Sequence, residues 1–172
     1  MTLATVTRRW VHVLVPVVIL WSCTGGDAQE RDTQLIRQMG FQFRDAVLNG
    51  DADVIASFID EAGIPCVDDH ISKDRVLSHL QNRDSWLFAY LFSPMEFEAK
   101  FKDAMHPVSL QRYFATAMDL ELLISFSESP TRAHSNYACI HFRSSNFAVW
   151  PELCFFRRDG RWFLSDSPYD CV

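Results

Sequence analysis

The chain has 172 residues, of which 48% are hydrophobic and 22% charged, and its formal net charge is −6. This is the composition of a globular protein rather than of a disordered or fibrous one. Two of its cations, Arg8 and Arg9, lie in a segment predicted to be removed, which leaves a domain with a charge near −8. Because binding to phosphates requires clustered Lys and Arg, this balance argues against nucleic acid and anionic lipid as partners.

Residues 1–22 have the organisation of a signal peptide. Arg8 and Arg9 precede an apolar run from Trp10 to Trp21. Such a run spans about 18 Å as a helix, which is short against a hydrocarbon core of roughly 30 Å. The sequence Leu20-Trp21-Ser22-Cys23 resembles a bacterial lipobox, which implies that Cys23 is acylated and becomes the first residue of the mature protein.

Two alternatives remain open for the N-terminus. One is a plain secretory signal cut near the small residues Gly26 and Ala28, and the other is an uncleaved anchor. All three interpretations predict export, to the cell envelope or periplasm in lipid-anchored form, or alternatively as a secreted protein. We expect residues 23–31 to form a tether and residues 32–172 to form a single domain.

The first half of this domain is predicted to be helical. Asp32 can cap a helix that runs to about residue 48 and ends at Asn49-Gly50. Apolar residues recur there at the spacing of one helix face: Leu35, Ile36, Met39, Phe43, Ala46 and Val47. Asp51 caps a second, short helix, and a third helix follows Ser72.

The middle of the chain contains a dense apolar run over residues 85–92. This run fits either a buried helix or a strand, and we favour the helix. The segment from Leu110 to Ala117 also has helical character.

From residue 121 the hydrophobic period changes to two, which is typical of strands. We predict strands at 121–128, 137–143, 152–158 and 161–165. Asp159-Gly160 is a strong hairpin signal, and it places Phe156 opposite Phe163 and Phe155 opposite Leu164. The predicted fold is therefore α+β, with N-terminal helices packed on a curved antiparallel sheet of about four strands.

Two segments resemble a known superfamily. AVLNGDADVIASFI (residues 46–59) resembles the helix, Gly-Asp turn and short helix that open the cone-shaped nuclear-transport-factor-two-like superfamily. FFRRDGRWFLSD (residues 155–166) resembles the final hairpin of that superfamily. The resemblance implies a cone with a pocket, used by members for dehydratase, isomerase or cyclase chemistry or for binding. No catalytic motif transfers residue by residue.

Four cysteines remain after Cys23, and an oxidising compartment would allow them to pair. If strands 137–143 and 152–158 pair symmetrically over the loop between them, Cys139 lies opposite Phe156 and diagonally next to Cys154. A register shifted by two residues brings the two cysteines directly opposite each other. Cys66 and Cys171 would then pair by elimination.

The alternative is that all four are small buried residues with free thiols. No spacing matches a familiar zinc motif, since there is no C-x-x-C and Cys66 with His70 is half a site. We expect no metal and no cofactor.

Two groups of residues are candidates for a pocket. In Asp68-Asp69-His70, a carboxylate could orient the imidazole of His70 for general base catalysis. The simpler interpretation is that Asp69 or Ser72 caps the next helix. Tyr137 and His141 share one strand face, and this face would point inward if Cys139 between them is bonded or buried.

These observations predict a protein that binds a small apolar ligand or a partner protein of the envelope and is not an enzyme. The alternative is a pocket enzyme that uses acid–base chemistry, of dehydratase, isomerase or hydrolase type. A third interpretation is a structural envelope lipoprotein that has no pocket.

Overall fold

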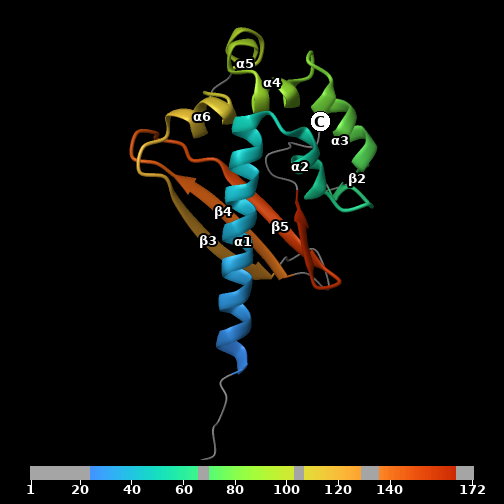
Figure 1. The fold of residues 1–172 in the computed structure, drawn as a ribbon, viewed down its shortest axis with the longest axis vertical. Coiled ribbons are helices and arrows are strands. Elements are labelled where there is room, and N and C mark those ends of the chain that lie inside the picture. The colour runs from blue at the N-terminus through green and yellow to red at the C-terminus, as the bar shows by residue number, and fades with distance from the viewer. Residues whose placement is uncertain (1–23, 66–69, 103–106, 129–135, 166–172) are drawn as a thin grey trace, which may run out of the picture.

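The fold consists of helices followed by an antiparallel sheet, which confirms the α+β prediction (Figure 1). The computed structural model describes residues 24–65, 70–102, 107–128 and 136–165. The helices are α1 (Thr24–Asn49), α2 (Ala52–Ser57), α3 (Lys73–Gln81), α4 (Trp86–Phe92), α5 (Pro94–Lys100) and α6 (Leu110–Thr116). The strands are β1 (Ile64–Pro65), β2 (His70–Ile71), β3 (Glu121–Glu128), β4 (Asn136–Arg143), β5 (Glu152–Arg158) and β6 (Arg161–Leu164).

The main sheet has the strand order β3-β4-β5-β6, and every neighbouring pair is antiparallel. The predicted hairpin register is confirmed, because Phe156 pairs with Phe163 and Phe155 with Leu164. Asp159 and Gly160 both have positive φ, 51° and 77°. Such a pair makes the tight turn whose twist matches that of two antiparallel strands.

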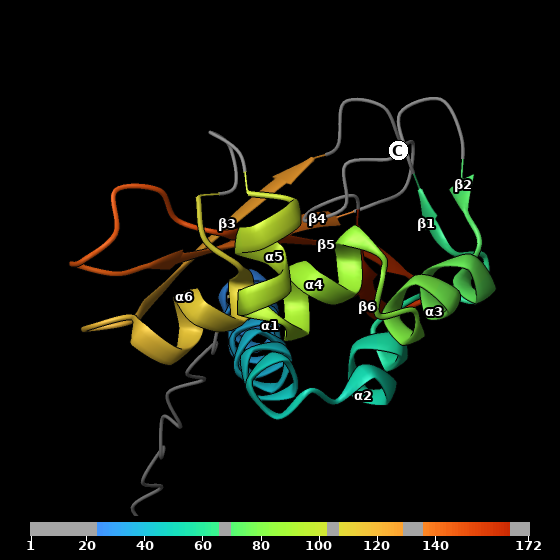
Figure 2. The same ribbon diagram turned by 90° about the horizontal axis from the view of Figure 1, so that it is seen from above.

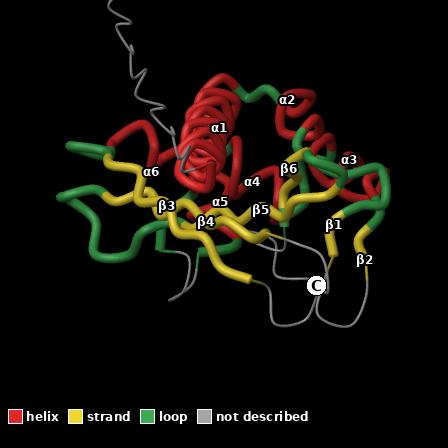
Figure 3. The backbone as a smooth tube through the Cα atoms, turned by 90° about the horizontal axis from the view of Figure 1, so that it is seen from below, coloured by secondary structure: helices red, strands yellow, loops and turns green. Residues whose placement is uncertain are grey.

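Helix α1 lies along one face of the strand layer (Figure 3). Its residues Ile36, Phe43 and Val47 are completely buried. Leu35, which was predicted to be buried with them, is 42% exposed, so that prediction was wrong. Successive helical residues are rotated by about 100°, and the stripe centred on Ile36 and Phe43 therefore leaves Leu35 at its edge.

The start of α1 differs from the prediction. The helix begins at Thr24, so the segment expected to be a tether is helical from that residue on, and Asp32 lies inside the helix rather than capping it. The Asp32 carboxylate instead binds Arg157 of β5, with 2.9 Å between Oδ2 and Nη1. Because the ion pair joins α1 to the sheet, it gives Asp32 a structural role that its sequence position did not reveal.

The shorter helices begin where the sequence supplies a capping side chain. Asp51, Ser72, Ser85 and Ser109 each accept a hydrogen bond from a backbone N–H three residues further on. The apolar run at 85–92 forms α4, as favoured, and Leu87, Ala89, Tyr90 and Leu91 are buried in it. Seen from above, α4 and α6 lie beside the C-terminal half of α1 (Figure 2).

Candidate functional site

Strand β4 presents two different faces. Ala138, Ile140 and Phe142 are buried toward the helices, since a side chain added at Gly40 of α1 would meet Ile140 and Phe142. Tyr137, Cys139 and His141 alternate with them and therefore lie on the opposite face of the sheet. This face lies away from α1 and not in the layer between helix and sheet where the pocket was expected, although Cys154 and Phe156 on it are buried, at 2% and 3% exposure.

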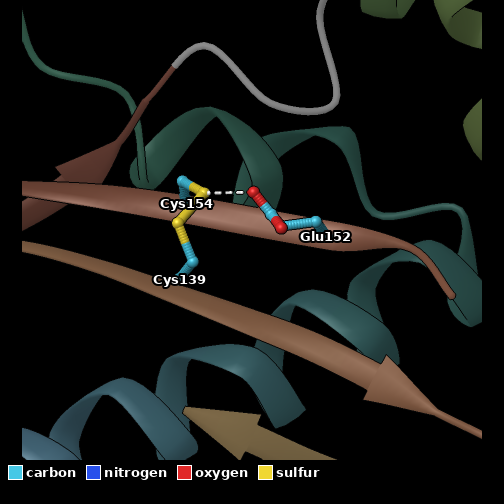
Figure 4. Close-up of side chains that lie close together, drawn as sticks. All are labelled: Cys139, Glu152 and Cys154. Atoms are coloured by element: carbon cyan, nitrogen blue, oxygen red, sulfur yellow. Dashed lines mark hydrogen bonds between the residues drawn. A yellow bond between two sulfur atoms is a disulfide. The ribbon is translucent and has the colours of Figure 1, made fainter. Parts of the chain in front are cut away.

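Cys139 and Cys154 are directly opposite each other in the register of β4 and β5. Their sulfurs form a disulfide across the two strands, with 4.1 Å between the Cα atoms (Figure 4). This is the register shifted by two residues, in which Tyr137 rather than Cys139 faces Phe156. The short Cα separation is that of a non-hydrogen-bonded antiparallel pair, in which facing side chains are closest.

Glu152 and His141 form the next facing pair on the same surface. Glu152 Oε1 lies 3.0 Å from Sγ of Cys154. In the disulfide this sulfur carries no hydrogen, and in the thiol form it would donate to the carboxylate. Glu152 Oε2 lies 3.0 Å from Nδ1 of His141, and both side chains are about two-fifths exposed. The carboxylate thus bridges a sulfur and an imidazole.

The other predicted site residues are placed differently. Asp69, together with Asp68, Cys23, Cys66 and Cys171, lies outside the described residues. His70 belongs to β2, where its backbone pairs with Pro65 of β1. The predicted Asp69–His70 group and the Cys66–Cys171 pairing therefore stay predictions.

Among the described residues, large side chains pack in the space between the helices and the sheet. Phe43, Phe142, Phe155 and Tyr113 are almost completely buried there. Two depressions of about 450 Å³ and 460 Å³ lie on helix surfaces instead, one along the outer side of α1 around Phe41 and the other on α3 around Leu77. Neither lies between α1 and the sheet, where the resemblance to a cone would place a pocket.

Two tyrosines in this interior have perturbed ionisation. Burial raises the pKa of Tyr113 to about 12 and raises the pKa of Tyr90 as well. The Tyr113 hydroxyl donates to the carbonyl oxygen of Phe142, which ties α6 to β4. Both hydroxyls remain protonated at neutral pH and can act as hydrogen-bond donors in the core.

Sequence reasoning missed a cluster of exposed apolar side chains at one end of the sheet. Met118 follows α6, while Val149 and Trp150 lie in the loop between β4 and β5, and all three are at least 40% exposed. Both connections lie at the same side of the molecule (Figure 2), and Met118 forms hydrogen bonds with Ser144 and Asn146 at the start of the β4–β5 loop. We call Met118, Val149 and Trp150 the tip patch. The sequence signal for it was the run Phe147 to Trp150, apolar residues between two strands.

In comparisons with known proteins, no family model, no curated protein and no solved structure matches the chain. The resemblance to the nuclear-transport-factor-two-like superfamily therefore rests on the two sequence segments. Within the described residues, no helix combines the length and the hydropathy needed to cross a bilayer.

Proposed function

We propose that this is an exported protein, anchored to an envelope membrane through an acylated Cys23, which binds a partner protein through the tip patch. The observation that carries the proposal is the contrast between large side chains buried between α1 and the sheet and apolar side chains exposed on two connections joined by hydrogen bonds, among the described residues. A carrier of small apolar ligands needs a pocket, usually of about 300–1,000 Å³ and lined by apolar residues. Clustered exposed apolar residues are typical of protein-binding surfaces.

The tip patch is held by hydrogen bonds between its two connections. The backbone N–H of Met118 donates to Oγ of Ser144 at 3.0 Å and to Oδ1 of Asn146 at 2.9 Å. In return, the N–H of Ser145 donates to the carbonyl of Met118 at 3.2 Å. The Arg143 guanidinium lies 5.3 Å from the centre of the Trp150 ring. A surface ordered before binding loses less entropy when a partner binds.

Two further observations support export and the orientation. The Cys139–Cys154 disulfide is a bond that persists outside the reducing cytoplasm. Helix α1 begins directly after Cys23, and its first turns extend past the sheet on the side away from the tip patch (Figure 1). A lipid on Cys23 would place the membrane at that end and leave the tip patch facing away from it.

Anchoring is tested by mass spectrometry of the mature protein and by membrane fractionation. We expect an acylated N-terminal Cys23, and a Cys23→Ser variant that leaves the membrane fraction. A mature protein that begins after residue 26, without lipid, would contradict the anchor but not the partner.

Partner binding is tested by placing a photo-crosslinking amino acid at position 150 in cells that make the protein. The matched control is position 95, because Met95 of α5 is 81% exposed and lies outside the tip patch. We expect a defined adduct from position 150 only, and a Trp150→Ala change that weakens binding to the purified partner by about 30-fold, as at a hot-spot residue. Equal adducts from both positions, or no effect of Trp150→Ala, would contradict the proposal.

A further inference from the structure

We propose that Cys139, His141, Cys154 and Glu152 form a Zn²⁺ site that becomes available when the Cys139–Cys154 disulfide is reduced. The inference concerns the face of β4 and β5 that lies away from α1, where Cys154 is buried and His141 and Glu152 are about two-fifths exposed, and it does not depend on the function proposed for the tip patch. It also differs from our expectation that the chain binds no metal, which considered ligand spacings within a single segment.

The four side chains form two facing pairs on one surface. The sequence places a cysteine and a histidine two residues apart in β4, and a glutamate and a cysteine two residues apart in β5. Residues two apart on a strand point to the same face. The register then sets Cys139 opposite Cys154 and His141 opposite Glu152. The pairing of two strands thus assembles a ligand set that neither strand contains alone.

The ligand atoms are already near one another. The sulfurs of Cys139 and Cys154 and a carboxylate oxygen of Glu152 all lie within 4.8 Å of one another (Figure 4). The Nδ1 atom of His141 lies 3.0 Å from the other oxygen of Glu152. Ligand atoms around a tetrahedral Zn²⁺ are about 3–4 Å apart, since bonds to zinc measure roughly 2.0–2.3 Å. Three of the four ligands therefore already lie together, and the imidazole of His141 would have to turn from the carboxylate toward the sulfurs to complete the set.

The chemistry of the donors selects the metal. Two thiolates are soft ligands that favour Zn²⁺ over Mg²⁺ or Ca²⁺, and imidazole and carboxylate complete a tetrahedral set. With a neutral imidazole, the two thiolates and one carboxylate carry three negative charges, which leaves one after Zn²⁺ binds. The oxidised pair offers no thiolate, so the disulfide and the metal exclude each other.

The conversion requires a reductant, which would be a dithiol. The dithiol gives two electrons and two protons, so that the Cys139–Cys154 bond breaks, two protein S–H bonds form and the reductant closes its own disulfide. Zn²⁺ then replaces both thiol protons, which are released. Both protons leave to solvent, so that Glu152, 3.0 Å from the sulfur of Cys154, stays ionised as a ligand.

The experiment is a Co²⁺ titration of the full chain in mild detergent, after anaerobic reduction with a phosphine. We expect one Co²⁺ for each chain, with the thiolate charge-transfer and tetrahedral visible bands, and displacement of Co²⁺ by Zn²⁺. The oxidised protein should show none of these bands. The double change Cys139→Ser/Cys154→Ser should abolish them, while the matched control Cys66→Ser/Cys171→Ser should retain them.

Two further variants keep both cysteines and therefore keep the disulfide in the oxidised protein. His141→Ala and Glu152→Gln should each weaken Zn²⁺ binding at least about 10-fold in competition with a chromophoric chelator. The proposal is overturned if the reduced protein binds no metal, or if binding survives the Cys139→Ser/Cys154→Ser change. It is equally overturned if circular dichroism shows that the reduced chain with Zn²⁺ loses its sheet, because the site needs β4 and β5 to be paired.

Discussion

Gly40 marks the closest approach of α1 to the sheet, and substitution there tests how tightly the two layers pack. A Cβ atom at this position would lie 2.6 Å from Cδ1 of Ile140 and 3.0 Å from Cδ2 of Leu122. Both distances are shorter than a normal van der Waals contact of about 3.5–4.0 Å between carbon atoms. Gly40→Ala should therefore press the helix against β3 and β4.

The expected change in the free energy of unfolding is the sum of two opposing effects. Replacing Gly by Ala inside a helix stabilises it by about 0.5–1 kcal/mol. Overpacking a dense core costs about 1–3 kcal/mol. Because Ile140 is completely buried and has little room to move, we expect the second term to dominate. The free energy of unfolding should fall by about 0.5–2 kcal/mol.

Ile140→Val supplies a matched partner, because it removes only the Cδ1 methyl that the new Cβ would touch. Alone it should cost about 0.5–1.5 kcal/mol. In the Ile140→Val variant, the loss of unfolding free energy caused by Gly40→Ala should be smaller by about 1 kcal/mol. A double-mutant cycle measures this difference as a coupling energy. Gln42→Ala, on the exposed side of the same helix, should change stability by no more than about 0.5 kcal/mol.

The assay is urea denaturation followed by circular dichroism, in which a change of 1 kcal/mol shifts the midpoint by roughly 0.3–1 M. If Gly40→Ala costs the same in both backgrounds, the clash with Ile140 is not its cause. If it stabilises the protein by the full helix-propensity term, α1 does not lie as close to the sheet as the structure places it.

The remaining predictions concern polar contacts in the interior. Tyr113→Phe leaves the carbonyl of Phe142 without its donor and should cost about 1–3 kcal/mol in urea denaturation. Since burial raises the pKa of Tyr113 to about 12, from a reference value of 10.0, the unfolded chain loses this proton first. Above pH 10 each of the two buried tyrosines, Tyr113 and Tyr90, should lower stability by about 1.4 kcal/mol per pH unit, and Tyr113→Phe should remove one of these two contributions. Asp32→Ala leaves Arg157 without its carboxylate, and thermal unfolding should show a loss of about 1 kcal/mol, whereas Asp45→Ala, which removes an exposed pair with Arg44, should change little.

The parts of the fold that sequence predicted well are those set by local chemistry. Capping residues such as Ser72 and Asp51 specify helix starts by a single hydrogen bond, and Asp159-Gly160 specifies a turn and with it a register. Where a hairpin has a long loop, as between β4 and β5, the loop does not determine the register. The choice between the symmetric and the shifted pairing of Cys139 therefore needed the structure.

The candidate site was harder to predict because it depends on which face of the sheet the helices cover. Tyr137 and His141 were correctly assigned to one face, yet period-two patterning treats the two faces alike until a packing partner is known. In β4 both faces carry apolar side chains, and it is the face of Ala138, Ile140 and Phe142 that packs in the core with α1. Glu152 could be identified as part of the candidate site only from its distances to His141 and Cys154 in the structure.

The disulfide lies on the face of β4 and β5 away from α1, which leads to a last prediction, that its reduction weakens the fold without opening the core between α1 and the sheet. The bond closes a loop between residues separated by 15 positions. Removing such a cross-link costs about 3 kcal/mol, because the unfolded chain regains conformational freedom. The buried layer of Ile140, Phe142 and Phe155 does not contact solvent and is built from the other face. A domain of this size is typically stable by about 5–15 kcal/mol, so most molecules should remain folded after reduction.

Urea denaturation of the oxidised and reduced protein measures this difference, and near-ultraviolet circular dichroism reports whether the aromatic core keeps its packing. We expect a lower midpoint and a nearly unchanged aromatic signal. Collapse of that signal on reduction would mean that the bond between β4 and β5 holds the core together. In that case Cys139 and Cys154 could not change their redox state in a folded protein, and neither metal binding nor thiol chemistry at this pair would be possible.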